Sequence, residues 1–193
     1  MKREILITIS LLILSNAAWS QKAPDGFHGI KWGVTRQQVK ETLDLIPHSS
    51  CYDFENFILF SYEDEEQNKI GEVFVSDYEF TFSKSDKFYQ FLVRFRKAHL
   101  HNLHNFDVLL RAMKSKYGNP SKTVPLMAQI NPKAKIGTLY TWIVENKVEI
   151  TLWYNDMEEL KINGNLLYTN LSIERETEKA RDKDITKTKD KLA

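Results

Sequence analysis

Short runs in which every second residue is large and apolar constrain this chain more than any other feature. Such alternation buries one face of a strand and leaves the other exposed to solvent, which is typical of antiparallel sheets. Runs of this kind cover residues 78–82, 91–95, 140–144, 148–154 and 167–173, and an earlier apolar run at 57–62 predicts a further strand. Polar connectors that predict hairpin loops or turns separate them at 63–68, 83–87, 145–147 and Asn163-Gly164, the last typical of a type I′ turn.

Two other segments repeat their apolar residues at helical spacing. Thr35 and Gln38 form a capping box at the start of the first helix, and Pro47 ends it. Asn105 is expected to cap the second helix, and Gly118 suits the left-handed residue that ends it. Because strands surround both helices in the sequence, we expect their apolar stripes to face a core.

The order of helix, three strands, helix, and three or four strands predicts an α+β fold, with two helices packed on one face of an antiparallel sheet. It is compatible with a duplicated α-β-β-β unit, with halves at 29–97 and 102–174. We expect one domain over 21–173. Of the twenty residues 174–193, thirteen are charged and none is aromatic, so we expect a disordered or frayed-helical tail.

Residues 1–20 have the organisation of a cleavable secretory signal peptide. Basic residues precede the apolar run Ile5–Leu14, and the small residues Ala18 and Ser20 follow it. The run is too short for a transmembrane helix, which needs about 20 residues. We expect cleavage between Ser20 and Gln21, and therefore a periplasmic or secreted protein without a stable membrane anchor.

The charge balance and the single cysteine narrow the partners and the chemistry. The chain has 27 Lys and Arg and 26 Asp and Glu, and removal of Lys2, Arg3 and Glu4 with the signal leaves 25 of each. A neutral chain offers no electrostatic basis for binding nucleic acid or anionic membranes.

Cys51, the single cysteine, cannot form an internal disulfide. A nucleophile and an intermolecular bridge are open to it, but we favour a small residue entering a strand, because no charged neighbour that would lower its pKa is identifiable.

Common catalytic signatures are missing from the sequence: it has no G-x-S-x-G, H-E-x-x-H, C-x-x-C, P-loop or dinucleotide motif. A short His-rich stretch contains His99, His101 and His104. It has two possible interpretations: a Zn²⁺ or Cu²⁺ site, or a polar connector between a strand and a helix. We favour the connector, because the spacing matches no strong metal motif. His28 and His48 stand alone at predicted boundaries. We therefore assign no catalytic, cofactor-binding or metal-ligating residue and expect no cofactor.

Two short patches resemble known families. Gly29-Ile30-Lys31-Trp32-Gly33-Val34-Thr35 with Val39 resembles the opening G-I-x-W-G-x-S/T-x-x-x-V of many small exported bacterial proteins of unknown function. Tyr117-Gly118-Asn119-Pro120 with Tyr140-x-Trp142 resembles the outer-membrane assembly lipoproteins and the β-lactamase-inhibitor-like domains. This resemblance implies helices on an antiparallel sheet, often duplicated, in a non-enzymatic protein that binds other proteins in the bacterial envelope or outside the cell. The lipoproteins carry a lipidated Cys after the signal, where this chain has Gln21.

The leading hypothesis is a non-catalytic exported domain that binds another macromolecule, with a protein as the expected partner. The sheet face opposite the helices is the candidate surface. Trp153 and Phe74 are out of phase with their strands' apolar residues, which leaves two interpretations open: they face outward on that surface, or a closed sheet is buried on both faces. The alternative is a binder of a small ligand, lipid or metal in a cleft between sheet and helices. An enzyme with dispersed catalytic residues is the third hypothesis. Oligomeric state is left open.

Overall fold

The computed structural model describes residues 22–27, 29–63, 69–70, 73–95, 103–127, 135–155 and 163–192, without the side chains of 103–105, 155, 163 and 184–192. The predicted signal peptide lies outside these ranges, and so do His28, His99 and His101. His104 falls within a helix, but its side chain is outside the described part.

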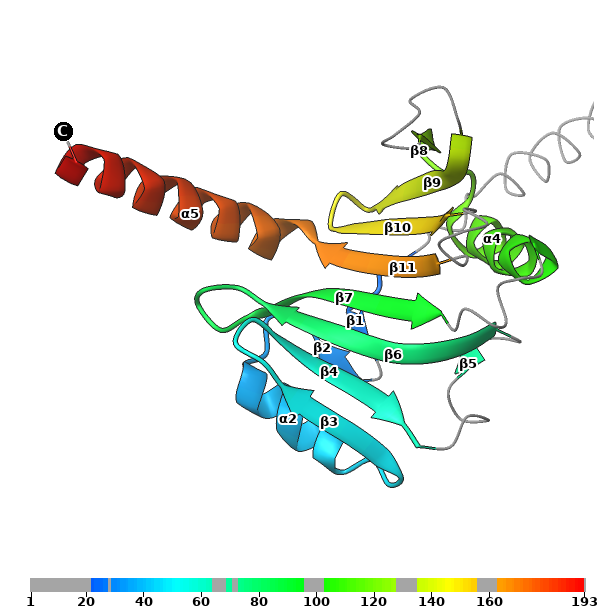
Figure 1. The fold of residues 1–193 in the computed structure, drawn as a ribbon, viewed down its shortest axis with the longest axis horizontal. Coiled ribbons are helices and arrows are strands. Elements are labelled where there is room, and N and C mark those ends of the chain that lie inside the picture. Colours follow the sequence, from blue (N-terminus) through cyan, green and yellow to red (C-terminus); the bar gives the residue numbers. More distant parts are fainter. Residues whose placement is uncertain are drawn as a thin grey trace, which may run out of the picture.

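One large antiparallel sheet of nine strands dominates the described fold (Figure 1). From one edge to the other, its strands are β3 (Ser49–Asp53), β4 (Phe57–Tyr62), β6 (Val73–Phe82), β7 (Phe88–Phe95), β11 (Asn163–Asn170), β10 (Val148–Asn155), β9 (Lys135–Val144) and β8 (Lys122–Met127). The short β5 (Lys69–Ile70) pairs with β6. A two-stranded ribbon precedes the sheet, formed by β1 (Gly26–Phe27) and β2 (Ile30–Lys31). The helices are α2 (Arg36–Asp44), α4 (Leu103–Tyr117) and α5 (Leu171–Leu192).

The predicted fold class, α+β with two helices on a sheet, is wrong. The described chain is β-rich, with more residues in strands than in helices, and it has three helices. The expected strand 167–173 ends at Asn170, whose side-chain oxygen accepts hydrogen bonds from the backbone N–H groups of Ser172 and Ile173 at 3.1 Å each. Asn170 thereby caps α5, and a two-residue apolar spacing over so few residues did not reveal the change from strand to helix.

Two strands without apolar alternation were not predicted, and both lie at the edges of the sheet. β3 reads Ser-Ser-Cys-Tyr-Asp, and β8 contains Pro125. An edge strand buries less surface than a central strand, so its sequence carries a weaker pattern. With these strands, each half of the sheet is one helix followed by a four-stranded meander, and the halves meet where β7 pairs with β11. The expected α-β-β-β unit is therefore one strand too short.

The helix and turn signals had mixed outcomes. The capping box of α2 is confirmed, because Thr35 accepts from the N–H of Gln38 while the Gln38 side chain accepts from the N–H of Thr35. The end of α4 is confirmed as well, with Gly118 at φ +76°. The predicted cap at Asn105 is wrong, since α4 begins at Leu103. The type I′ turn is also wrong, because Asn163-Gly164 pair with β10 inside β11.

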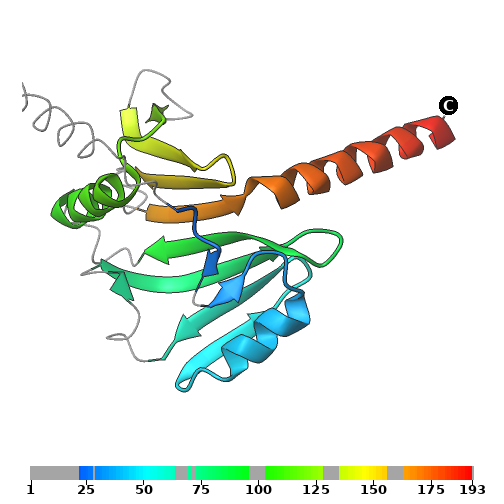
Figure 2. The same cartoon turned by 180° about the vertical axis from the view of Figure 1, so that it is seen from behind.

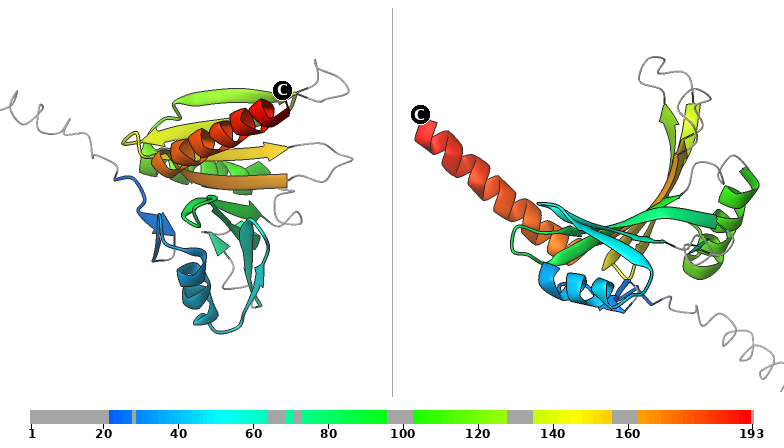
Figure 3. Two further views of the ribbon diagram at one scale, coloured as in Figure 1. Left: turned by 90° about the vertical axis from the view of Figure 1, so that its left-hand side faces the viewer. Right: turned by 60° about the horizontal axis from the view of Figure 1, so that its bottom comes forward.

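The core lies on one face of the sheet, which we call the covered face. Its register places one buried apolar residue after another across the central strands: Ile58, Phe60, Tyr78, Phe80, Phe91, Val93, Leu166, Ile150, Leu152 and Trp142. Phe27 stacks on Phe91 with ring centroids 3.6 Å apart, and Phe106 of α4 meets Tyr154 at 4.4 Å. Figure 2 shows β1, β2 and α2 over this face, and Figure 3 shows α2 and α4 outside the curve of the sheet.

The third helix, α5, extends away from the sheet (Figure 1). Its first turns lie near β7 and β11, and every described side chain from Glu178 onward is exposed. It includes most of the charged segment 174–193, which offers no apolar stripe for packing. Within the described chain, none of the helices combines the length and apolar character needed to cross a membrane.

Candidate interaction surface

The sheet face opposite α2 and α4, which we call the open face, presents its side chains in rows that run across the strands. The central row is Tyr52, Leu59, Glu79, Leu92, Leu167, Thr151, Thr141 and Lys122. Each member lies directly opposite its neighbours in the strand register, so the row continues from β3 to β8. Side chains at such positions are about 4.5–5.5 Å apart at Cβ and contact one another.

Two further rows flank the central one. The Trp153 row consists of Asp77, Arg94, Asn165, Trp153, Leu139 and Val124. The Gln90 row consists of Phe57, Thr81, Gln90, Thr169, Glu149 and Ile143. The three rows together form a mixed surface in which apolar side chains are interspersed with polar and charged ones.

Apolar side chains of the open face are only half-buried, in contrast to those of the core. Leu59, Leu92 and Leu167 of the central row retain intermediate exposure, and Tyr52 at the β3 end is 55% exposed. In the Gln90 row, Ile143 on β9 is 49% exposed. An apolar band that no described helix covers is the kind of feature that marks binding surfaces.

Trp153 and Phe74 lie on the open face, as their phase predicts. Trp153 is half-buried, whereas its neighbour Leu152 is fully buried on the covered face. Phe74 is half-buried between the buried Val73 and Val75, and the Lys69 ammonium lies 4.3 Å from its ring centroid. The alternation along β6 and β10 was therefore a sufficient signal for both residues.

One guanidinium and two carboxylates form the charged centre of the open face. Arg94 donates through Nη1 to Asp77 Oδ1 at 2.7 Å and through Nη2 to Glu79 Oε2. Burial lowers the pKa of Arg94, but the hydrogen bond and charge of Asp77, with those of Glu79, outweigh it and the net direction is upward. The triplet combines one basic and two acidic side chains, a formal net charge of −1.

Threonine and glutamate make the Gln90 row more polar than the central row. Gln90 Nε2 donates to Thr169 Oγ1 at 3.2 Å, and Thr151 Oγ1 of the central row donates to Glu149 at 3.4 Å. Glu149 also acts on α5, where burial, Glu178 and then Glu149 raise the pKa of Glu174. The acidic side chains thus meet where α5 leaves the sheet.

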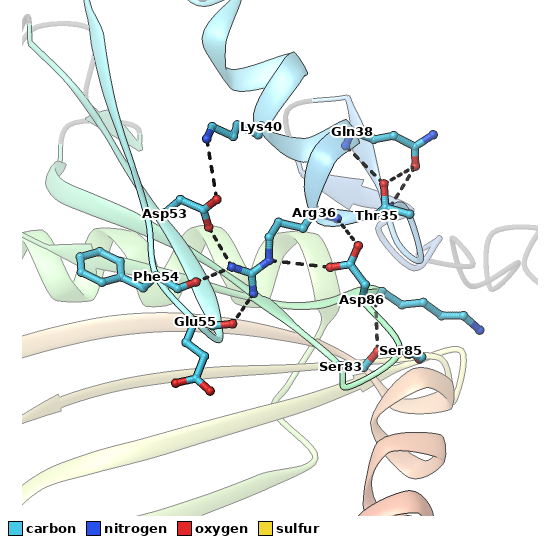
Figure 4. Close-up of polar contacts among 11 residues, drawn as sticks. Thr35, Arg36, Gln38, Lys40, Asp53, Phe54, Glu55, Ser83, Ser85 and Asp86 are labelled. Carbon is cyan, nitrogen blue, oxygen red and sulfur yellow. Dashed lines mark hydrogen bonds and ion pairs between the residues drawn. The ribbon is translucent and has the colours of Figure 1, made fainter.

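A second polar cluster, around Arg36, is structural (Figure 4). The guanidinium donates to Asp53 Oδ1 at 2.8 Å, to the carbonyl oxygen of Phe54, and to that of Glu55 at 2.6 Å. Its Nε lies 3.7 Å from Asp86 Oδ1. These contacts engage all three guanidinium nitrogens and tie the start of α2 to the β3–β4 turn, so Arg36 is poorly placed to bind a ligand. No sequence pattern signalled these partners, which come from distant loops.

Two open depressions lie beside α2. One, of about 450 Å³, is lined by Ile30 of β2, by Val34 between β2 and α2, by residues of α2, and by Leu45 just after α2. The other, of about 530 Å³, is bordered by Arg36, the β6–β7 hairpin and Thr177 of α5. Thr81 Oγ1, which borders the second, is buried and has no hydrogen-bond partner within the described chain. Between α2 and the sheet, the fully buried Val39 and Leu43 occupy the interior.

The remaining residues considered from sequence are dispersed. Cys51 is half-buried in the middle of β3, where burial, followed by Asp44, raises the pKa of its thiol. The thiol is therefore mostly protonated at neutral pH, a poor state for a nucleophile. His48 is exposed in the connector between α2 and β3. In the described ranges, no group of three or more His, Cys, Asp or Glu side chains is placed to hold a metal ion.

Comparisons of the chain with protein-family models, with curated proteins and with solved structures found no match. The two resemblances drawn from the sequence motifs therefore stay predictions, and the open face is the strongest candidate site that the geometry offers.

Proposed function

We propose that this protein is a non-catalytic exported domain that binds another protein through the open face of its sheet. The observation that carries the proposal is the central row, in which half-buried leucines and an exposed tyrosine cross the sheet without a covering helix. The export part of the proposal rests on the signal-peptide pattern of residues 1–20.

The extent of the open face favours a macromolecule over a small ligand. Eight strands at a spacing of about 4.8 Å make a surface about 34 Å wide. A small ligand would cover only part of it, whereas a protein interface of about 800 Å² per partner has this scale. Trp153, Tyr52 and Arg94 belong to the residue types that are enriched where protein interfaces gain most of their binding energy.

Charge on the open face favours a protein over a nucleic acid. The three rows contain the acidic side chains Glu79, Asp77 and Glu149 and the basic side chains Arg94 and Lys122, a net charge of −1. Phosphate backbones require an excess of Lys and Arg. The surface instead suits a partner whose apolar patch has a few basic groups at its rim.

The experiment compares binding by three forms of the purified protein. The natural protein, the open-face variant Leu167→Arg and the control variant Leu45→Arg are immobilised and exposed to envelope and secreted fractions of the native host. Leu45 is 83% exposed at the end of α2, away from the open face, so its replacement matches the added charge without touching the proposed surface. Any captured protein is then purified and its Kd for each form measured.

We expect one protein to bind the natural form and Leu45→Arg with equal affinity and Leu167→Arg at least about 30-fold more weakly, the effect of losing an interface centre. Ile143→Asp, at a position 49% exposed on the same face, provides a second variant that does not perturb the core. Equal affinity for Leu167→Arg, Ile143→Asp and the natural form would contradict the proposal. So would a failure to capture any protein that discriminates among them.

A further inference from the structure

The two edges of the nine-stranded sheet differ in how they are protected. A sheet edge exposes unpaired N–H and C=O groups, and natural edges are usually blunted by proline, lysine or a bulge. β8 has all three, with Pro125, Lys122 and a register shift between Leu126 and Met127. β3, the strand along the other edge in Figure 1, contains neither proline nor lysine, and its register with β4 is continuous.

The hydrogen bonds that flank β3 show which backbone groups point outward. The N–H of Phe54 donates to the carbonyl of Phe57 at 2.9 Å, and the N–H of Glu63 donates to the carbonyl of His48 at 2.7 Å. In an antiparallel ladder, hydrogen-bonded and non-hydrogen-bonded pairs alternate, so the even-numbered residues of β3 bond to β4. The backbone N–H and C=O groups of Ser49, Cys51 and Asp53 therefore point away from the sheet, and no other described residue bonds to them.

This set of outward groups is complementary to itself. If two copies of β3 pair antiparallel about a two-fold axis at Cys51, Cys51 faces Cys51 of the other copy and Ser49 faces Asp53. That register pairs all three outward residues, whereas a two-fold axis at Ser50 or Tyr52 pairs only two of them. It also keeps the two Asp53 carboxylates apart, because each faces Ser49 of the other copy, and each carboxylate keeps Arg36 and Lys40 of its own chain as partners.

We propose that the β3 edge is the interface of a two-fold symmetric dimer, in which β3 of one copy pairs with β3 of a second copy of this chain in the register centred on Cys51. In the part of the chain that the structure describes, the β3 edge has no proline, lysine or bulge while the β8 edge is blunted, so the pairing closes after two copies. It also covers Tyr52, since the two Tyr52 side chains become diagonal neighbours on the open face, within aromatic reach.

The proposal is independent of the proposed function, although it has a consequence for it. The central row of the open face ends at Tyr52 on β3, so pairing at this edge joins the two open faces into one surface. Loss of the dimer would leave each open face intact on its own chain. The mass and crosslinking of the purified protein therefore test the dimer without reference to any captured partner.

The test measures the mass of the purified natural protein by sedimentation equilibrium, with two variants at the same position. Cys51→Ser keeps the outward N–H and is expected to remain dimeric. Cys51→Pro removes that N–H at an outward position, where an edge strand accepts proline, and is expected to raise the dimer Kd by more than about tenfold. Circular dichroism melting establishes that each variant is folded.

A crosslinking experiment tests the register in which the two β3 strands pair, and it does not depend on whether Cys51→Pro folds. Opposed Cα atoms in a hydrogen-bonded antiparallel pair are about 5.5 Å apart, so a short bis-maleimide should join the two Cys51 thiols of the natural protein. Cys51→Ser lacks the only cysteine in the sequence and is the negative control. Cys51→Ser combined with Lys84→Cys moves the thiol to the exposed β6–β7 hairpin, and this variant should not crosslink.

A single-chain mass for the natural protein at concentrations up to about 1 mM would overturn the proposal. A dimer would also overturn it if folded Cys51→Pro dimerises as tightly as Cys51→Ser. A dimer that crosslinks through Lys84→Cys and not through Cys51 would place the interface elsewhere, and the β3 edge would then be excluded.

Discussion

Trp142 of β9 donates its indole N–H to the carbonyl oxygen of Gly118 at 2.9 Å, just beyond the end of α4. The two residues are 24 positions apart in the chain. They belong to the two short segments on which one of the sequence resemblances rests, and the bond joins the end of the helix to the strand. Trp142 is only 2% exposed, so this contact is part of the core.

Replacement of Trp142 by Phe should lower the free energy of unfolding by about 2 kcal/mol, because it leaves a small cavity and removes the partner of the Gly118 carbonyl. Urea denaturation followed by fluorescence or circular dichroism measures this change. Trp153→Phe, at a half-buried position of the open face, should cost clearly less. Equal costs for the two variants would mean that the Trp142–Gly118 bond adds little.

Gly118→Ala should destabilise the protein by about 1–2 kcal/mol, because an alanine at φ +76° is strained. A Cβ at this position would meet no heavy atom within 4 Å, so the whole cost comes from the backbone. Gly118→Asn should cost less, since asparagine tolerates the left-handed region better. Thermal unfolding measures the three forms, and we expect the melting temperature to be highest for the natural protein, lower for Gly118→Asn and lowest for Gly118→Ala. An alanine variant as stable as the natural protein would contradict the prediction.

Replacement of Arg36 by Met should lower the free energy of unfolding by about 2 kcal/mol, since it leaves Asp53 and two backbone carbonyls without their donor. The Arg36 side chain is 23% exposed, so solvent replaces these bonds only in part. Arg36→Lys should recover only a fraction of the loss, because one ammonium cannot reproduce the planar fork of donors. The midpoint of urea unfolding measures both.

Arg111→Met is the matched control for Arg36→Met. Arg111 is exposed on α4 and, among the described residues, donates only to the carbonyl of Asp107 in its own helix. Its loss should change stability by less than about 0.5 kcal/mol. If Arg36→Met is no more destabilising than this control, the Arg36 cluster does not hold α2 to the β3–β4 turn.

Glu174→Gln should stabilise the protein at neutral pH. Burial, then Glu178 and Glu149, raise the pKa of Glu174 above 4.5 in the folded state, although it lies in the first turn of α5, where the helix dipole favours a carboxylate. A raised folded pKa means that the stabilising protonated form is present at low pH and is lost as pH rises through that pKa. The advantage of the glutamine variant should therefore be absent at about pH 4 and grow toward about pH 7.

Unfolding midpoints at a series of pH values test this prediction. Glu176→Gln is the control, because the Glu176 side chain is 62% exposed and lies 3.5 Å from the Lys87 ammonium. That variant should be no more stable than the natural protein at any pH. If the difference in unfolding midpoint between Glu174→Gln and the natural protein stays constant with pH, ionisation of Glu174 does not affect folding.

Local signals in the sequence determined those parts of the protein that depend on nearest neighbours. The alternation at Tyr78, Phe80 and Phe82 is that of a strand with one buried face, whatever lies beside it. Thr35 with Gln38, and Gly118 after Tyr117, satisfy the ends of helices through bonds a few residues apart. The same periodicity placed Trp153 and Phe74 on the face away from the core.

Tertiary structure alone decided the rest. The weakly patterned edge strands β3 and β8, and the pairing of β7 with β11, depend on which strand finds which neighbour, and a two-residue period carries no information about partners. The partners of Arg36 were invisible in the sequence as well, because those contacts arise between segments that only folding brings together. The cap at Asn170 is local, but the apolar spacing continues through it and hid the change from strand to helix. The open face and the β3 edge both depend on this strand pairing. Alternation predicts that the sheet has a solvent-exposed face, but only the complete sheet determines how wide that face is and which strands form its edges.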